Sequence, residues 1–217
     1  MQTKPSKIVI TAGPTREPLD PVRYISNFST GAMGYALAAE AEAEGFDVCL
    51  ITGPVALSAP LGVRKIDVTT AEEMLKAVEQ EIEGSCCVIM AAAVCDFRPV
   101  KASVQKIRKT GGRLRVELEE NPDIIASIGR REGLLKIGFA LETRKAVRSA
   151  LEKLQRKQLD LIVVNEISGA NDPFGEGKKD FLIMGCSGER DEYKALTKRE
   201  LAAEIVRRVR KKKGDDG

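Results

Sequence analysis

Apolar residues gather along the chain in short runs that alternate with longer, mixed stretches. The runs at 7–12 and 47–52 are rich in β-branched residues, and each is closed by a Gly-Pro pair. Runs that are apolar throughout are typical of strands buried on both faces of a parallel sheet. By this pattern we expect strands at 7–12, 47–52, 63–68, 86–94, 134–141 and 159–166, and another that ends near 185.

The stretches between these runs carry helix signals. Gly45 is a stop after an alanine-rich segment, and Thr70 with Glu73 has the spacing of a capping box. Strands that alternate with helices predict an α/β fold: a Rossmann-like, doubly wound, mostly parallel open sheet with helices on both faces. We expect one domain over 1–217, since no linker or repeat interrupts it. The expected helices span about 31–44, 70–83, 143–158 and 198–212.

Three segments break the alternation. Residues 13–29 are expected to form a long loop between the first strand and the first helix. Residues 99–120 are polar and alternating, with Gly111-Gly112 as a turn, which predicts a small two-stranded β flap. Residues 168–177 form a glycine-rich loop.

Composition excludes several kinds of chemistry. The chain has no histidine, so a Ser-His-Asp triad, a histidine base and a histidine-ligated metal are ruled out. The formal net charge of +3 does not suggest a nucleic-acid partner. Five cysteines without a Cys-x-x-Cys pair indicate free thiols and a reducing, cytoplasmic location. We expect no signal peptide and no membrane span.

A first candidate site lies at the start of the first helix. Ser29 and Thr30 offer hydroxyls there, and Gly31 and Gly34 allow close approach of the backbone. Next to the unpaired N–H groups of a helix N-terminus, this suits a phosphate or carboxylate. The alternative is a Ser/Thr cap, with glycines needed only for packing of the helix on the sheet.

Further candidates follow the fourth strand and lie in the flap. Three alanines at 91–93 allow close approach, and Asp96 and Arg98 follow them. Asn121 is expected to cap another helix that begins at Pro122. The cations Lys106, Arg108 and Lys109 lie in the flap, and Lys153 and Lys157 lie one helical turn apart. Each feature has a structural alternative, such as packing, a cap or solvated surface, but together they suit a nucleoside triphosphate without a P-loop.

Two other classes of protein fit less well. An NAD(P)-dependent reductase or epimerase would need an acidic residue after the second strand and a Tyr-x-x-x-Lys pair, and both are missing. A nucleic-acid-binding or scaffold protein could use the basic run at 207–213, but this run is short and lacks aromatic residues.

The motifs together resemble the phosphopantothenoylcysteine synthetase (phosphopantothenate–cysteine ligase) family, the synthetase domain of a bifunctional protein of bacterial coenzyme A biosynthesis. The resemblance covers roughly 7–181. It is carried by ITAGPTREPLDPVRYISNFSTGAMG, AAAVCDFRP, KIRK, NPDII, GFALET and KLQRKQLDLIVVNE, in family order.

The resemblance implies an activity. A ligase of this family joins 4′-phosphopantothenate and L-cysteine through an acyl-cytidylate, with CTP as co-substrate, Mg²⁺ as cofactor, and pyrophosphate and CMP as products. It implies a homodimer and a separate or fused flavin-dependent decarboxylase, with no flavin in this chain. The choice between CTP and ATP and the identity of the metal ligands stay open.

The resemblance also implies roles for particular residues. Asn27 and Lys106 would be catalytic, Lys106 as a flap residue that closes on the intermediate. Phosphopantothenate would be bound by Arg23, Asn27, Ser29, Thr30 and Gly31. The nucleotide would be bound by Met90, Ala91, Ala92, Asp96, Lys106, Pro122, Asp123, Ile124, Ile125, Phe139, Lys153 and Lys157.

One position departs from the family pattern. The residue after Gly31 is usually basic, but here it is Ala32. Either another cation supplies that charge, or the chain binds its substrate more weakly.

Overall fold

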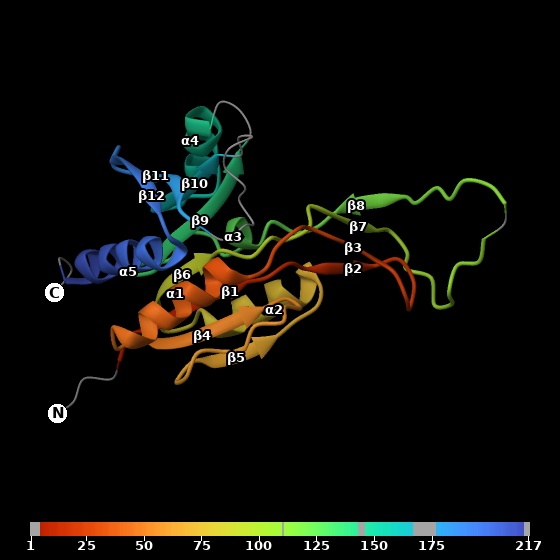
Figure 1. Ribbon diagram of the computed structural model, residues 1–217, viewed down its shortest axis with the longest axis horizontal. Coiled ribbons are helices and arrows are strands. Elements are labelled where there is room, and N and C mark those ends of the chain that lie inside the picture. The colour runs from red at the N-terminus through yellow and green to blue at the C-terminus, as the bar shows by residue number, and fades with distance from the viewer. Residues whose placement is uncertain (1–4, 110, 143–145, 167–176, 215–217) are drawn as a thin grey trace.

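The computed structural model describes residues 5–109, 111–142, 146–166 and 177–214. Its centre is an open eight-stranded sheet, from which a narrow extension projects to one side (Figure 1). In spatial order the strands are β12 (Arg190–Leu196), β11 (Lys179–Gly185), β10 (Leu161–Glu166), β9 (Leu135–Glu142), β6 (Ser85–Met90), β1 (Lys7–Ala12), β4 (Asp47–Thr52) and β5 (Arg64–Asp67).

The sheet is parallel from β10 to β5, and β11 and β12 extend it antiparallel at one edge. From β1 the chain runs outward to β4 and β5, then returns to β6 on the other side of β1. This reversal is the topological switch point, where open α/β sheets bind ligands at the carboxyl ends of the strands. The predicted fold class is confirmed.

Helices cover both faces of the sheet. The helices are α1 (Ala32–Ala43), α2 (Ala71–Glu81), α3 (Ile124–Ser127), α4 (Ala146–Arg156) and α5 (Lys198–Gly214). Along β1, Ile8 and Ile10 face the layer of α1 and α5, whereas Val9 faces the layer of α2, α3 and α4. All three side chains are fully buried, as the period of two in a strand requires when both faces are covered.

The start of α2 is as predicted. The Thr70 hydroxyl accepts a hydrogen bond from the Glu73 N–H at 3.2 Å, and the Glu73 carboxylate accepts one from the Thr70 N–H at 3.3 Å. The capping box therefore satisfies two backbone donors that a helix N-terminus would otherwise leave unpaired.

The glycines at the start of α1 are required by backbone conformation and close packing. Gly31 has φ 77°, a left-handed conformation that side chains disfavour. A Cβ on Gly34 would lie 2.5 Å from the Cβ of Ala12 and 2.9 Å from the carbonyl oxygen of Thr11. The helix can therefore lie this close to β1 only with glycine at that position, as the packing alternative supposed.

The extension consists of two two-stranded sheets and a long loop (Figure 1). One sheet pairs β2 (Arg16–Pro18) with β3 (Tyr24–Ser26), inside the segment expected to be a loop. The other pairs β7 (Phe97–Pro99) with β8 (Leu118–Glu120). The flap prediction was therefore right at the base only, because no strand is assigned to the described residues between Pro99 and Leu118.

Other boundaries also differ from the prediction. Residues 91–94 form a loop after β6, and α3 is a single turn capped by Asp123 instead of Asn121. Strand β12 was not expected. Most of the glycine-rich loop, 168–176, lies outside the described residues, as do 143–145 at the expected start of α4. Among the helices described, none is long and apolar enough to cross a membrane.

Both edge strands of the sheet are rich in charge. At one edge, β12 carries Arg190, Asp191, Glu192 and Lys194. Its pairing with β11 is irregular near Lys179, where the register shifts. At the other edge, β5 is the short sequence RKID.

Candidate functional site

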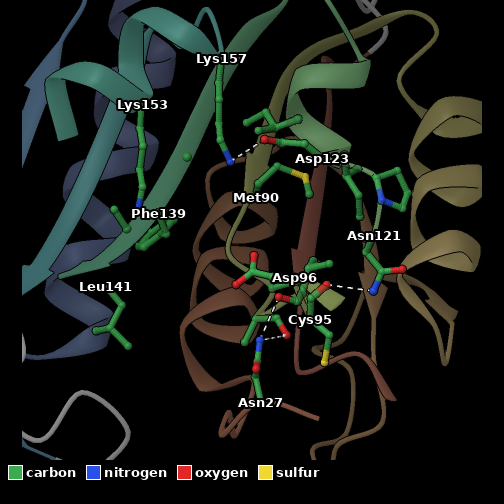
Figure 2. Close-up of a pocket in the computed structure, with 18 of the residues that line it drawn as sticks. Asn27, Met90, Cys95, Asp96, Asn121, Asp123, Phe139, Leu141, Lys153 and Lys157 are labelled. Atoms are coloured by element: carbon green, nitrogen blue, oxygen red, sulfur yellow. Dashed lines mark hydrogen bonds and ion pairs between the residues drawn. The ribbon is translucent and has the colours of Figure 1, made fainter. Parts of the chain in front are cut away.

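A cleft of about 850 Å³ opens at the carboxyl ends of β6 and β9 (Figure 2). It lies between the loop after β6 on one side and α3 and α4 on the other. It brings together most of the residues expected to bind the nucleotide: Met90, Ala92, Asp96, Pro122, Asp123, Ile124, Ile125, Phe139, Lys153 and Lys157, with Asn27 at its rim.

A smaller hollow of about 190 Å³ adjoins this cleft at the N-terminus of α1. The two share the wall residues Ala92, Ala93, Phe139, Ala140 and Leu141. The hollow is lined by Ser29, Thr30, Gly31 and Ala91 from the predicted site. The cleft and the hollow are therefore two parts of one recess along the sheet edge.

The loop after β6 is held by hydrogen bonds that continue the pairing of β1 with β6. Pro14 and Ala93 form an isolated bridge beyond the strand ends. The hydroxyl of buried Thr11 accepts from the Ala92 N–H at 3.2 Å, and that of buried Thr15 accepts from the Cys95 N–H at 2.9 Å. These two threonines set the wall of the cleft, and we did not single them out from the sequence.

Asn27 reaches across from the extension to the same loop. Its side-chain NH₂ group donates to the carbonyl oxygen of Val94 at 2.8 Å and to that of Ala93 at 3.4 Å. Because these carbonyls occupy the donors, the group of Asn27 that remains for a ligand is its carbonyl oxygen, an acceptor.

The opposite wall carries the predicted cations. Lys153 and Lys157 extend side by side from the end of α4 toward the cleft (Figure 2). The Lys157 ammonium pairs with the Asp123 carboxylate at 2.9 Å, and Asp123 also accepts from the Ala126 N–H at 3.3 Å as the cap of α3. Asp123 thus holds the Lys157 side chain beside the N-terminus of α3.

Asn121 has a different role from the one expected. Its amide NH₂ donates to the Cys95 carbonyl oxygen at 2.9 Å, and its backbone N–H donates to the Asp96 carbonyl oxygen at 2.8 Å. It therefore fastens the segment before α3 to the loop after β6. Its buried side-chain oxygen has no hydrogen-bond partner among the described residues.

Arg23 and Lys106 line neither the cleft nor the hollow. The Arg23 guanidinium pairs with the buried Asp20 carboxylate and donates to the Ile107 carbonyl oxygen at 2.6 Å. The Asp20 carboxylate also accepts from the Ile107 N–H at 3.1 Å. The pairing with Arg23 holds the pKa of Asp20 well below its ordinary value. Lys106 is exposed on the same loop of the extension.

Ser29 and Thr30 behave as turn residues. The Ser29 hydroxyl accepts from the Gly31 N–H at 3.2 Å, and the Thr30 hydroxyl accepts from the Ala32 N–H at 3.4 Å. The N-cap of α1 is Gly31 and no side chain caps the helix, so the alternative of a Ser/Thr cap is wrong, although Ser29 and Thr30 stabilise the turn before α1 and also line the hollow.

Two lysines missed in the sequence lie beside the departure at Ala32. Lys179, only 6% exposed, and Lys198 line the hollow together with Ala32. They come from β11 and the start of α5, far along the chain, so no local pattern could have joined them to the first helix.

The cysteines offer no reactive thiol in the cleft. Burial raises the pKa of Cys95, which lines the cleft. All five cysteines are free. Among the described residues, no group of three or more acidic or cysteine side chains is placed to hold a metal ion.

The fold and the recess define a doubly wound α/β protein with a recess at the carboxyl ends of its parallel strands, beside the switch point of the sheet. Residues 3–212 match the family model described as DNA/pantothenate metabolism flavoprotein C-terminal domain, and the chain belongs to this family. The family resemblance found in the sequence is thereby confirmed.

Individual relatives agree with this assignment. The chain is 41% identical over 204 residues to the coenzyme A biosynthesis bifunctional protein CoaBC of Vibrio cholerae, covering 92% of this chain and 51% of the relative. It is 40% identical over 206 residues to a cysteine/cysteine sulfinic acid decarboxylase of an unknown prokaryotic organism, covering 94% and 57%. The chain thus spans about half the length of the curated relatives it matches.

A solved structure matches over nearly its whole length. The crystal structure of the C-terminal domain of a CoaBC protein superposes with a TM-score of 0.82 at 38% identity, covering 97% of this chain and 96% of that one.

Proposed function

We propose that this chain is a phosphopantothenate–cysteine ligase that acts in coenzyme A biosynthesis. Family membership supports the reaction class. The observation that carries the assignment is the convergence on one cleft of the loop after β6 with its Asp96, a capped turn at α3, and the two lysines at the end of α4. Such a reaction is mainly positioning and charge stabilisation, so a chain without histidine can perform it.

CTP would bind in the larger cleft. Lys153 and Lys157 supply positive charge for its phosphates, while Phe139 and Met90 provide apolar surface. Lys157 is already paired with Asp123, so an incoming phosphate would compete with that carboxylate. Asp96 would be the polar anchor on the opposite side.

The smaller hollow would take an anionic group of a substrate. Lys179 and Lys198 supply there the charge that Ala32 lacks, next to the start of α1. Of the two outcomes left open by the sequence, this favours replacement of the usual cation by cations from elsewhere in the fold.

Asn27 would act on the second half-reaction. Its side-chain carbonyl oxygen is an acceptor at the rim of the cleft, which suits the N–H groups of the incoming cysteine amine. Lys106 would act only after the extension changes position, because the residue is exposed on the loop and lines neither part of the recess. Arg23 would contribute to this change of position, because its guanidinium holds the backbone of Ile107, the residue after Lys106.

Mg²⁺ would arrive with the nucleotide. This ion is commonly held by one or two carboxylates together with substrate phosphates. Asp96 and Glu120 line the cleft and fit that role, whereas Asp123 is engaged by Lys157. The ion would neutralise phosphate charge as pyrophosphate leaves.

We propose further that the chain forms a homodimer through the extension. Large apolar side chains are exposed along it: Val22, Tyr24, Phe97, Val100, Val104, Leu114, Val116 and Leu118. Val104 is 91% exposed, and a surface of this kind typically marks an interface. Sedimentation should give a dimer that Val104→Asp together with Leu114→Asp converts to monomer. A wild-type monomer at micromolar concentration with full activity would contradict the proposal.

A flavin-dependent decarboxylase, fused or separate, would be the metabolic partner. The overlap with only about half of each curated relative is compatible with either arrangement.

The decisive experiment is turnover with 4′-phosphopantothenate and L-cysteine, comparing CTP with ATP. We expect pyrophosphate release that requires phosphopantothenate, and product only when cysteine is added. Release that is independent of phosphopantothenate would refute the assignment.

A further inference from the structure

Behind the cationic wall of the cleft lies a lysine that the proposed reaction does not use. Lys136 is 2% exposed and is among the largest fully buried side chains. It occupies β9 opposite Val88 of β6, two residues before Gly138, which lines the cleft. Burial of an ammonium costs several kcal/mol (roughly) unless it is well hydrogen-bonded, so an apolar residue would be the simple choice there.

The ammonium group is bonded to two helix ends. Its Nζ donates to the Gly129 carbonyl oxygen, just after α3, at 2.9 Å. It also donates to the Lys157 carbonyl oxygen, just after α4, at 2.9 Å. The last carbonyls of a helix lack intrahelical donors, and a cation is favourable beside them.

A second contact links α3 and the end of α4 on the cleft side. The side chain of Lys157 pairs there with Asp123, which caps α3. The contacts therefore close a ring: Lys136 joins the segments just after α3 and α4, and the pair Lys157–Asp123 joins the N-terminal cap of α3 to the residue after α4 on the cleft side (Figure 2 shows this pair).

Hydrogen bonds with Asp160 hold the backbone of Lys136 in place. Its backbone N–H donates to the Asp160 carboxylate at 2.7 Å, and the Asp160 N–H donates to its carbonyl oxygen at 2.9 Å. Burial lowers the pKa of Lys136, and the charges of Asp160 and Asp123 partly offset this.

We propose that Lys136 is a positioning residue for anion binding: by tying the ends of α3 and α4 together, it fixes where Lys157 stands in the cleft. It touches no substrate and acts through the Lys157 backbone. This rests on the proposed nucleotide site, but the ring itself does not, so the two can be tested apart.

The test compares Lys136→Met with Lys136→Arg and a control. Methionine keeps the length and apolar stem but donates no hydrogen bond, whereas arginine keeps the charge and the donors. Ile205→Val, in α5 on the opposite face of the sheet, is the matched control because it removes one buried methyl far from the ring.

The first measurement is amide hydrogen exchange in the absence of ligand. We expect exchange over 124–129 and 153–159 to rise about tenfold in Lys136→Met, since two hydrogen bonds from a charged donor are lost. It should stay near wild type in Ile205→Val and be largely restored in Lys136→Arg. Unchanged exchange in these two segments of Lys136→Met would overturn the ring, whatever the protein binds.

The second measurement is steady-state turnover with CTP. We expect the KM for CTP to rise about tenfold in Lys136→Met with kcat within about twofold, because only the placement of Lys157 changes. Raised exchange with an unchanged KM would overturn the role in binding while leaving the ring intact. A wild-type protein that neither binds nor turns over CTP would refute the proposed function instead. The amide hydrogen-exchange comparison would still test the ring of contacts.

Discussion

The recess at the sheet edge and the extension are held together by different interactions. The recess is enclosed by buried strands and by a loop whose Ala92 and Cys95 N–H groups donate to the hydroxyls of buried Thr11 and Thr15. The extension exposes large apolar side chains, and its loop is fastened to the β2–β3 side chiefly through Asp20 and Arg23. The difference suggests a preformed binding site and a part that acquires its working position through a second copy or a ligand.

The largest expected effect lies in the extension. Lys106→Gln should slow acyl-cytidylate formation about 100-fold, because a charge that stabilises the departing pyrophosphate is lost. The affinity of the free protein for CTP should hardly change, since Lys106 does not line the cleft. Quenched-flow assays with labelled phosphopantothenate measure the rate of acyl-cytidylate formation, and calorimetry measures the affinity for CTP. A large loss of CTP affinity would mean that the extension already closes over the cleft in the free protein.

A comparable but separate loss is expected at the rim. Asn27→Asp should form acyl-cytidylate yet couple cysteine about 100-fold more slowly, because a carboxylate cannot donate to the carbonyl oxygens that hold the side chain, so the acceptor oxygen is no longer fixed in position. The carboxylate also loses the donors to the Ala93 and Val94 carbonyl oxygens, so the loop after β6 should loosen. The same assay, quenched before and after cysteine is added, should show accumulated intermediate. Coupling at the normal rate would show that Asn27 only supports the loop.

A pair of glycine variants compares the packing of the two regions. Gly34→Ala should destabilise the fold by about 1–3 kcal/mol, because the new methyl meets Ala12 and Thr11. Gly112→Ala in the extension should have little effect, since nothing described lies within 4 Å of the added carbon. Urea unfolding followed by circular dichroism gives both values. Equal stability of the two variants would show that α1 can move away from β1 without cost.

A smaller change is expected from the lysines of α4. Lys153→Gln and Lys157→Gln should each weaken CTP about tenfold and CMP less, because the lost attraction scales with phosphate charge. Lys157→Gln also leaves the Asp123 carboxylate unpaired in the cleft. Adding Asp123→Asn should therefore recover part of the affinity. If CTP affinity in calorimetry is the same in the single variants and wild type, the phosphates lie elsewhere.

The smallest effect concerns the fastening of the extension. The pKa of Asp20 is lowered by Arg23, so its stabilising contribution is present above its ordinary pKa of about 4 and is lost as pH falls through the folded-state value. Asp20→Asn should mimic the low-pH state at neutral pH and speed tryptic cleavage within 101–109 a few-fold. Cleavage at the wild-type rate would show that apolar contacts, and not this ion pair, hold the loop.

Much of the sheet could be predicted because its central strands are apolar on both faces, and two of them end at Gly-Pro pairs. The same reasoning made residues 91–94 a continuation of β6, since periodicity cannot show that the pairing there becomes a single bridge. Strand β12 was not predicted because an edge strand has solvent on much of its surface. Its sequence is therefore mostly polar and lacks the apolar run that marked the other strands. The short pairs β2–β3 and β7–β8 were missed or misplaced for a similar reason.

The site could be predicted where local sequence carries it. The capping box at Thr70 and the lysine pair of α4 follow from spacing alone, and family motifs supplied the rest. Lys136, Lys179 and the threonines of the cleft wall could not be found this way. Their roles come from contacts between residues distant in sequence, and a lysine within an apolar run gives no sign of which carbonyls it will meet.

The charged edges of the sheet bear on how the protein behaves when crowded. An unpaired edge strand is a template on which another chain can add, which is the first step toward aggregation. Here β5 is short, and β12 carries charges of both signs and pairs irregularly with β11. A newly made copy that meets either edge would have to bury those charges, so lengthening of the sheet from chain to chain is disfavoured at both ends. In the proposed homodimer, self-recognition would instead use the apolar side chains of the extension, where contact can be made without opening the core.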